Sequence, residues 1–195
     1  MPPKSDIRTN HNNMKRDLIL THLQGCKTIL DMGFGRGGDL PKYKQLNVSS
    51  IVGIDPDESS LSEARERAVN LDMDKILETR YGSTDKIYHP TEQYDAIVSN
   101  FAFHYFFESE KYLKSVLDVF KTILKPGGKF IGIVPDAVKI LRATSKDNGR
   151  YEDVEGNVIY RDPSKTGWGN YNEKVGFSVK GPFYDGKPKT EPLCY

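Results

Sequence analysis

The chain has 195 residues, of which 37% are hydrophobic and 28% are charged, and its formal net charge is +1. These values fit one soluble globular domain with a core of ordinary size. No apolar run approaches the roughly 20 residues that span a bilayer, and the sequence shows no secretory-leader pattern, so we expect neither a membrane protein nor a secreted one.

Charge is distributed unevenly along the chain. Residues 1–50 hold eight Lys/Arg and four Asp/Glu, residues 51–110 hold five and thirteen, and residues 111–195 hold fifteen and ten. This layout suits a face that holds a phosphate chain beside an acidic pocket, although solvated faces explain the same counts. Cys26 and Cys194 show no metal-ligand spacing, so we expect reduced thiols in a cytosolic or nuclear setting and no bound metal.

The first predicted element is a short helix that begins at Asn12 or Asn13 and reaches Leu23. An asparagine at this position is a good N-cap, and residues 1–10 before it are expected to be flexible. Lys15 lies one turn into the helix, just upstream of a glycine-rich stretch. It is either a surface lysine or a ligand contact.

The next stretch, residues 28–40, reads TILDMGFGRGGDL. A strand over Lys27–Asp31 ends in an acid, a glycine-rich turn follows, and a helix begins at Leu40. Glycines such as Gly33 and Gly35 let the backbone turn sharply and approach a ligand, and the helix end presents unpaired N–H groups. Because ligands bind at the carboxyl ends of parallel strands, this stretch predicts a nucleotide-type site.

Two nucleotides compete for this site. Gly33, Gly35 and Gly38 satisfy the dinucleotide fingerprint G-x-G-x-x-G, which carries little specificity alone. Asp31 argues against NAD, because an acid beside the turn repels a pyrophosphate. S-adenosylmethionine (SAM) carries an ammonium and a sulfonium and no phosphate, so we favour SAM. An NAD enzyme would also need residues that support hydride transfer between the cofactor and a substrate, and no such set is evident in the sequence.

A second strand is predicted over Ser50–Asp55 as a buried, parallel-type run. Its final acid lies 20 residues beyond Gly35, the position at which nucleotide folds hold ribose hydroxyls. A helix over Glu58–Asn70 follows, capped at Asp57 or Ser59. It is succeeded by a short strand near residues 76–80 and a fourth strand over residues 94–99.

The helix after the second strand carries Arg65 and Arg67. Side chains two residues apart do not share a helix face, so we expect one arginine at the site and the other on a solvated face.

Residues 100–109 read NFAFHYFFES and follow the fourth strand, where a parallel sheet exposes its active edge. Core packing explains Phe101 and Phe103 easily. It explains the adjacent polar-tipped pair His104 and Tyr105 less well. Aromatic and imidazole faces stack on splayed-out bases, so this pair is a candidate binding site.

A helix over residues 111–124, stopped by Lys-Pro-Gly-Gly, and a fifth strand over residues 129–134 complete the pattern. Four βα units specify an α/β fold with a doubly wound, mostly parallel sheet. A short helix is predicted over residues 137–143, with β-like pieces at 158–161 and 175–180. No repeat or linker is present, so residues 1–195 are predicted to be a single domain whose segment 144–195 is irregular and β-rich on the acceptor side.

With these residues assembled, the chain resembles the messenger-RNA cap guanine-N7 methyltransferases from residue 8 to about residue 141. The glycine motif and the Pro-Gly-Gly turn are shared by many SAM enzymes and carry little specificity. The particular matches are Asn12-Asn13-Met14-Lys15, Gly35-Arg36-Gly37-Gly38-Asp39-Leu40 and His104-Tyr105-Phe106-Phe107-Glu108-Ser109.

The resemblance implies a Rossmann-like class I methyltransferase that transfers a methyl group from SAM to N7 of the guanine cap of mRNA. Its partners would be capped RNA and other capping-enzyme subunits. It would act in the nucleus if cellular and in a cytoplasmic virus factory if viral. No metal and no general base are expected.

The resemblance also assigns site residues. Lys15 and Asp31 would face the methionine end of SAM, Asp55 would accept from the ribose hydroxyls, and His104 and Tyr105 would position the guanine. The full cofactor set is Lys15, Asp31, Gly33, Gly35, Asp55, Ser83 and Asn100. The full substrate set is Asn12, Asn13, Arg36, Asp39, Arg67, His104, Tyr105 and Glu191.

The chain departs from the family pattern in two places. In the family, an acid commonly accepts a hydrogen bond from the adenine amino group. Here the corresponding residues lie around Ser83, so Ser83 or Asp85 must accept that hydrogen bond. Glu191 aligns weakly with a late glutamate, and the chain ends before the tyrosine that usually follows it. The last hairpin strand of a seven-stranded methyltransferase sheet is also expected to be missing.

Two other functions fit most of these residues. A SAM methyltransferase for a small-molecule or protein acceptor shares everything except the His-Tyr loop. A noncatalytic cap-binding or SAM-binding subunit fits the altered adenine position.

Overall fold

The computed structural model describes residues 7–82, 92–154, 156–162, 174–178 and 189–192. The chain forms two compact units, one made of Met1–Phe103 with Lys114–Ile133 and the other of His104–Leu113 with Val134–Tyr195. None of the helices formed by the described residues is both long enough and apolar enough to cross a membrane.

The first unit contains a five-stranded sheet in the order β3-β2-β1-β4-β5, in which every neighbouring pair is parallel. Because the strand order reverses beside β1, a crevice for ligands is expected where the carboxyl ends of β1 and β4 meet. The doubly wound α/β prediction is confirmed. The strands are β1 (Thr28–Met32), β2 (Ser50–Asp55), β3 (Leu77–Tyr81), β4 (Tyr94–Asn100) and β5 (Leu124–Ile133).

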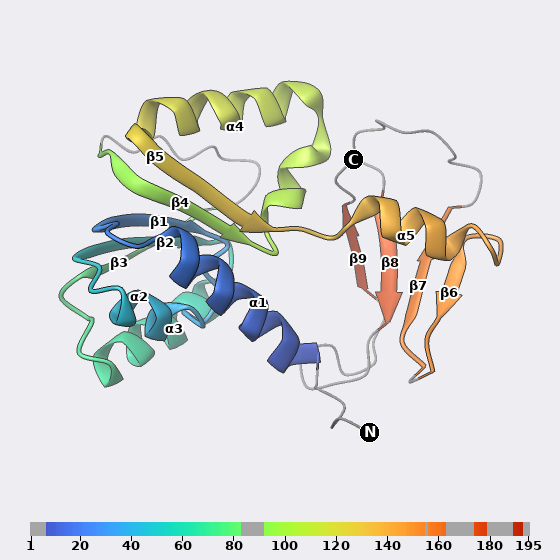
Figure 1. Ribbon diagram of the computed structural model, residues 1–195, viewed down its shortest axis with the longest axis horizontal. Coiled ribbons are helices and arrows are strands. Elements are labelled where there is room, and N and C mark those ends of the chain that lie inside the picture. The colour runs from blue at the N-terminus through green and yellow to red at the C-terminus, as the bar shows by residue number, and fades with distance from the viewer. Residues whose placement is uncertain (1–6, 83–91, 155, 163–173, 179–188, 193–195) are drawn as a thin grey trace. The chain divides into compact units, whose positions relative to one another are not determined.

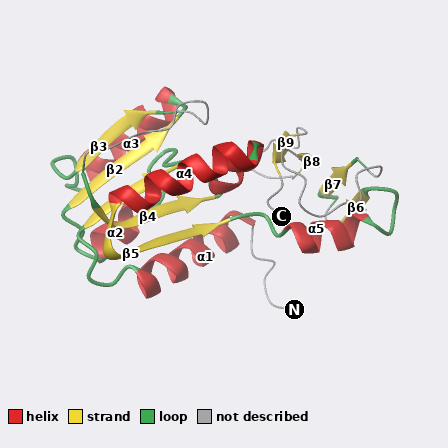
Figure 2. Cartoon of the chain, turned by 90° about the horizontal axis from the view of Figure 1, so that it is seen from above, coloured by secondary structure: helices red, strands yellow, loops and turns green. Residues whose placement is uncertain are grey.

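Helices cover both faces of this sheet. Figure 1 shows α4 over one face and α1, α2 and α3 over the other, and Figure 2 looks down on α4 above the strands. The helices are α1 (Ile7–His22), α2 (Leu40–Gln45), α3 (Glu58–Asn70) and α4 (Glu110–Ile123).

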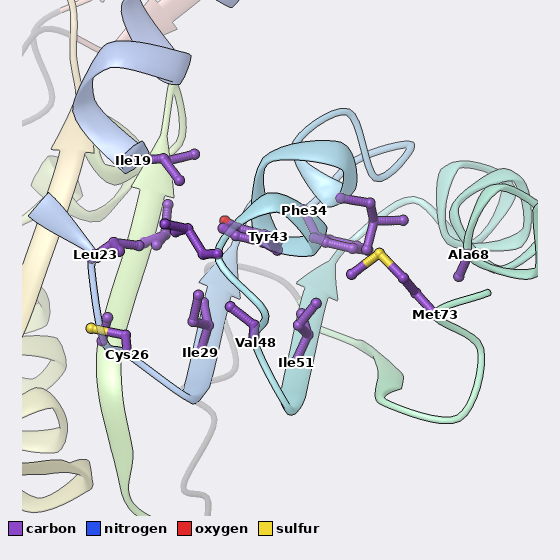
Figure 3. Packing of buried hydrophobic residues seen from close by; sticks show 14 of the residues in the cluster. Ile19, Leu23, Cys26, Ile29, Phe34, Tyr43, Val48, Ile51, Ala68 and Met73 are labelled. Carbon is purple, nitrogen blue, oxygen red and sulfur yellow. The ribbon is translucent and has the colours of Figure 1, made fainter. Parts of the chain in front are cut away.

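The main core lies between the sheet and the α1–α3 layer. Ile19 and Leu23 of α1 point toward Ile29 of β1 and Tyr43 of α2, and Ile51 of β2 continues the cluster (Figure 3). All five side chains are completely buried. Their burial stabilises the packing of α1 and α2 against β1, the strand that leads into the glycine turn.

The start of the first helix differs from the sequence prediction. The helix begins at Ile7, so Asn12 and Asn13 lie inside α1 and neither is its N-cap. Asparagine has low helix propensity because its amide competes with the backbone for hydrogen bonds. Here the Asn12 amide oxygen accepts a hydrogen bond from Lys42 instead, which favours its place within the helix.

Other boundaries were predicted closely. The strand over residues 50–55 and the helix over 58–70 match, and Asp57 is the N-cap through its bond from the Ser59 amide. The fifth strand is longer than predicted and starts at Leu124, because Pro126-Gly127-Gly128 forms an irregularity within the strand rather than a turn before it. Residues 103–108, predicted as a loop, form the 3-10 helix η1 (Phe103–Glu108).

The second unit contains a four-stranded antiparallel sheet in the order β6-β7-β8-β9. Helix α5 packs on it through Ala137 and Ile140, which meet Ile159 and Val175. The elements are α5 (Ala137–Thr144), β6 (Arg150–Glu152), β7 (Val158–Arg161), β8 (Lys174–Ser178) and β9 (Lys189–Pro192). Among the described residues, no antiparallel strand pairs with the five-stranded sheet.

A carboxylate joins three strands of the parallel sheet at their amino-terminal ends. Asp95 accepts hydrogen bonds from the backbone amides of Lys27 and Thr28, at 2.7 and 2.9 Å, and from Lys125 Nζ at 2.8 Å. The bond from Lys125, with those from Lys27 and Thr28, holds the pKa of Asp95 well below its usual range. Asp95 is therefore ionised and ties β1, β4 and β5 together.

Replacing Asp95 by alanine is expected to lower the free energy of unfolding by about 2–3 kcal/mol, because two amides and an ammonium lose a charged acceptor. Urea unfolding would measure this loss. The matched control is Asp118→Ala, an exposed acid of α4 paired with Lys121 at 3.2 Å, which should cost less than about 1 kcal/mol. Equal costs for the two variants would contradict the structural role of Asp95.

Candidate functional site

The glycine turn after β1 is built against two other strands. Gly33 and Gly35 adopt φ values of +83° and +54°, which glycine tolerates best. The amides of Gly33 and Phe34 both donate to the Ile54 carbonyl, at 2.9 and 3.0 Å, and so hold the turn to the end of β2. A Cβ on Gly33 would lie 2.2 Å from Cβ of Ala102, so the turn also approaches the end of β4.

Asp55 braces the turn from the end of β2. One of its carboxylate oxygens accepts from the Gly35 amide at 2.7 Å, and the other accepts from the Asp57 amide at 2.9 Å. Its side chain is half-buried. The acid predicted from its spacing to Gly35 therefore contacts the turn itself.

Asp31 is buried at the end of β1, with 3% of its surface exposed. Tyr43 of α2 donates its hydroxyl to one carboxylate oxygen at 2.6 Å. Burial raises the pKa of Asp31 to about 7, and the negative charges of Asp39 and Asp55 add to this, while Tyr43 and Lys15 act against it. Asp31 is therefore expected to lose its proton and become negatively charged when a cationic ligand binds beside it.

Asp31 should make stability depend on pH. In the unfolded chain an aspartate titrates near pH 4, whereas in the folded chain Asp31 holds its proton up to about pH 7. The folded state therefore binds more protons, and its stability falls as the pH rises through that window. Urea unfolding from pH 4 to 8 would measure this effect: the stability of the wild type relative to Asp31→Asn should fall as the pH rises. A relative stability that does not change with pH would contradict the raised pKa of Asp31.

A polar network joins α1, the glycine turn and β4. Asp39 lies at its centre, with 7% of its surface exposed. Its Oδ1 contacts Lys15 Nζ at 2.8 Å and Lys42 Nζ at 2.7 Å, and its Oδ2 accepts from Asn100 Nδ2 at 3.3 Å. Lys42 also donates to Asn12 Oδ1 at 2.8 Å. Four residues predicted from the sequence thus meet here, together with Lys42, which was not predicted.

Asp39 is ionised in this network. Burial alone would raise its pKa, but the charge of Lys15 and hydrogen bonds from Lys15 and Lys42 outweigh burial and bring the pKa below its usual value. Lys42 escaped prediction because a lysine on a short helix reads as a surface residue. Its 2% exposure shows the opposite.

The end of β4 presents an unsatisfied acceptor and a strained residue. Within the described part of the chain, Asn100 Oδ1 is buried and has no hydrogen-bond partner. Phe101 follows at φ +57°, and its ring lies 4.5 Å from the His11 ring of α1. Burial, helped by Lys15, holds the pKa of His11 below its usual value, so the ring is neutral. An orphaned acceptor beside the turn is suited to an ammonium donor from a ligand.

Comparison with known proteins identifies the family. A family model described as the mRNA (guanine-N(7))-methyltransferase domain matches residues 4–180. The chain belongs to this family. The mRNA cap guanine-N(7) methyltransferase of Candida glabrata is 32% identical over 187 residues, which are 90% of this chain and 42% of that protein. The Saccharomyces cerevisiae protein of the same name is 31% identical over 91% of this chain and 40% of its own length.

The chain thus spans about two fifths of the length of the cap guanine-N7 methyltransferases that it matches. A SAM-dependent methyltransferase from Clostridium acetobutylicum has a TM-score of 0.61 with this chain at 16% identity, covering 98% of this chain and 76% of that one. That likeness confirms the class I methyltransferase fold and nothing more.

In this guanine-N7 methyltransferase family member, the two arginines of α3 differ in their surroundings. Arg65 is bound to Glu58 at 2.6 Å and to the Thr79 hydroxyl at 2.7 Å. Arg67 instead approaches the glycine turn: a Cβ on Gly38 would lie 4.0 Å from its NH1 and 3.7 Å from Lys15 Nζ. Of the two arginines, Arg67 therefore lies nearer the turn, and its role at the site stays a prediction.

Arg36 and Asn13 are more exposed members of the predicted substrate set. Arg36 lies in the turn, 3.5 Å from the Glu63 carboxylate, and its side chain is 65% exposed. Asn13 is exposed on α1. Both side chains are therefore accessible to solvent.

His104 and Tyr105 lie in η1, and their rings are 4.3 Å apart. His104 has no exposed surface, whereas Tyr105 is 37% exposed. The pair was predicted to present two rings to a base. Only the Tyr105 ring reaches the surface, so the His104 ring lies behind it.

Three predicted residues remain. Ser83 and Asp85 lie outside the described residues. Glu191 lies in β9, where it pairs with Val175 of β8. Within the described ranges, no cluster of three or more His, Cys, Asp or Glu side chains is arranged to hold a metal ion.

Proposed function

We propose that this chain transfers a methyl group from SAM to N7 of the guanine cap of mRNA. The observation that carries the proposal is the family match over residues 4–180, which includes both the glycine turn and the His104–Tyr105 pair. The relatives that bear this activity in their names are longer than this chain, so the activity is proposed for it rather than transferred from them.

The residues around the glycine turn fit SAM. Asp31 offers a buried carboxylate to the cationic methionine end, and Lys15 offers an ammonium to its carboxylate. Asp55 remains half-buried, with a carboxylate able to accept from ribose hydroxyls. Asn100 Oδ1 is buried and has no hydrogen-bond partner within the described part of the chain, and it would accept from the SAM ammonium. Gly33 and Gly35 supply a turn with no side chain in the way.

The residues proposed to bind the methyl acceptor, capped RNA, include cationic and aromatic side chains. Arg36 and Arg67 would hold the phosphates of the cap, with Asn13 beside them. Tyr105 would contact the guanine, supported from behind by His104. Glu191 would accept hydrogen bonds from the guanine edge. Ser83 is assigned to the adenine of SAM on the resemblance alone.

The reaction requires the protein mainly to position SAM and the guanine relative to each other. SAM supplies an electrophilic methyl group, and guanine N7 has a free lone pair, so no residue needs to remove a proton first. Holding the two in line is worth roughly 7–11 kcal/mol in well-oriented reactions. A carboxylate such as Glu191 near the guanine would stabilise the positive charge that develops on the purine.

A methyl-transfer assay tests the proposal. The chain would be incubated with labelled SAM and RNA that carries an unmethylated GpppN cap, and the digested product would be examined for 7-methylguanosine. Label in that nucleotide is the expected result, and RNA with an already methylated cap should accept none. Label in a small molecule or protein but not in the cap would favour the broader methyltransferase reading. SAM or cap binding without transfer would favour a noncatalytic subunit.

Replacing Arg67 by alanine is expected to weaken capped-RNA binding several-fold and to reduce the salt dependence of binding, because one phosphate contact is lost. Binding would be measured by fluorescence anisotropy at several salt concentrations. Arg65→Ala is the matched control on the same helix and should leave the salt slope unchanged. An unchanged slope for Arg67→Ala would remove Arg67 from the phosphate site.

The proposed activity also suggests a setting. Capped transcripts arise in the nucleus of a cell or in the cytoplasmic factory of a virus, and other capping-enzyme subunits would supply the unmethylated cap. Co-purification with a guanylyltransferase activity would test the second point.

A further inference from the structure

Lys42 is a buried cation that the proposed chemistry does not use. Its side chain is 2% exposed, and burying an ammonium costs several kcal/mol unless each donor is paired. Its Nζ donates to Asp39 Oδ1 at 2.7 Å, Asn12 Oδ1 at 2.8 Å and the Gly38 carbonyl at 3.3 Å. An ammonium has three protons, and here all three have partners.

These partners come from separate parts of the site. Asn12 is on α1, Gly38 is in the glycine turn and Asp39 immediately precedes α2. An apolar side chain of similar length would fill the same space without the cost of burying a charge. The position of the charge therefore calls for an explanation beyond packing.

The charges of the three directly bonded groups Lys15, Lys42 and Asp39 do not balance; Asp31 interacts with Asp39 and Lys15 as well, and is assigned to the cationic end of SAM. Lys42 and Lys15 share the same carboxylate oxygen, so two ammonium groups face one ionised acid. Lys15 is the more accessible of the two, with 19% of its side chain exposed against 2% for Lys42. The surplus positive charge is thus presented by Lys15, beside Gly38 and the glycine turn.

We propose that Lys42 is a positioning residue: it neutralises Asp39 and so leaves the charge of Lys15 available to the carboxylate of SAM. This inference rests on the proposed function, because it assumes that SAM binds at the glycine turn. Without Lys42, Asp39 would neutralise Lys15, and the surplus charge would be lost. Asp39 has the opposite electrostatic effect on Lys15, and Lys42 offsets it.

Calorimetric titration with two ligands tests this role. One ligand is SAM, and the other is decarboxylated SAM, which keeps the sulfonium and the amine but has no carboxylate. Lys42→Met is expected to weaken SAM binding at least about tenfold, while binding of decarboxylated SAM changes by less than about threefold. Lys44→Met is the control, since Lys44 is on the same helix and its side chain is 51% exposed.

A double variant separates charge from structure. In Lys42→Met with Asp39→Asn, the acid and one ammonium are both removed, so Lys15 regains its surplus charge. SAM affinity should recover to within about threefold of wild type. Should Lys42→Met not fold, Lys42→Gln repeats the test with a hydrogen-bonding side chain in place of the charge.

The outcomes are distinct. Equal weakening of both ligands in Lys42→Met, or no recovery in the double variant, would show that Lys42 only supports the fold and would overturn this inference while leaving the proposed function intact. A wild-type chain that binds neither ligand would overturn the proposed function and this inference with it.

Discussion

Replacing Asp31 by alanine should weaken SAM binding about 100-fold, or about 2.7 kcal/mol, and should lower methyl transfer correspondingly at limiting SAM. The carboxylate is buried, and Tyr43 holds it in place at the end of β1. A charge in such surroundings is weakly screened, so its attraction for the cationic donor is much stronger than at the surface. Isothermal titration calorimetry at pH 8, where Asp31 is ionised in the free protein, would measure the loss.

Asp17→Ala provides the control for this measurement, because Asp17 is an exposed acid of α1. Its SAM affinity should stay within about twofold of wild type. Asp31→Asn keeps the shape of the side chain and should lose nearly as much affinity as Asp31→Ala. If Asp31→Asn binds SAM as tightly as wild type, the carboxylate charge is not what the donor recognises.

Replacing His104 by alanine is expected to lower turnover with capped RNA about 100-fold at saturating SAM, while SAM affinity stays within about threefold of wild type. The buried imidazole lies behind the Tyr105 ring, so its loss would leave a cavity and let that ring move. Placement errors of this kind reduce turnover strongly when catalysis depends on orientation. Single-turnover kinetics and calorimetry, run on the same preparation, would give the two numbers.

Thermal unfolding is needed beside these kinetics, because a buried histidine also supports its own unit. Tyr151→Ala serves as the control, since it removes a 41% exposed tyrosine from β6 of the same unit. Tyr105→Ala should share the turnover defect without a comparable loss of stability. If the His104→Ala variant loses SAM affinity and turnover equally, that result would contradict the assignment of His104 to the positioning of the guanine.

The parallel sheet was predictable because its central strands β1, β2 and β4 are continuous buried runs. A run such as Ser50–Asp55 has no polar alternation and is short and rich in β-branched residues, which is typical of a central strand between two helical layers. The antiparallel unit was less predictable. All three residues of β6 (Arg150–Glu152) are exposed, so no hydrophobic period marks it, and β9 (Lys189–Pro192) is short and contains a proline.

The candidate site was predicted in part for the same kind of reason. Asp31 and Asp55 end apolar runs beside glycines, and that pattern can be recognised in the sequence alone. The burial of Lys42 and of His104 depends on what other elements place around them. Periodicity cannot report such surroundings, which is why Lys42 was missed and both rings of the His104–Tyr105 pair were expected at the surface.

The close approach of Gly33 to Ala102 has a consequence for engineering. With only 2.2 Å between a Cβ at position 33 and the methyl group of Ala102, a side chain at position 33 would push the glycine turn away from Ala102. A chimera that grafts residues 100–109 onto another methyltransferase scaffold would therefore need a glycine at the equivalent of position 33. The two positions are best exchanged together, as one module.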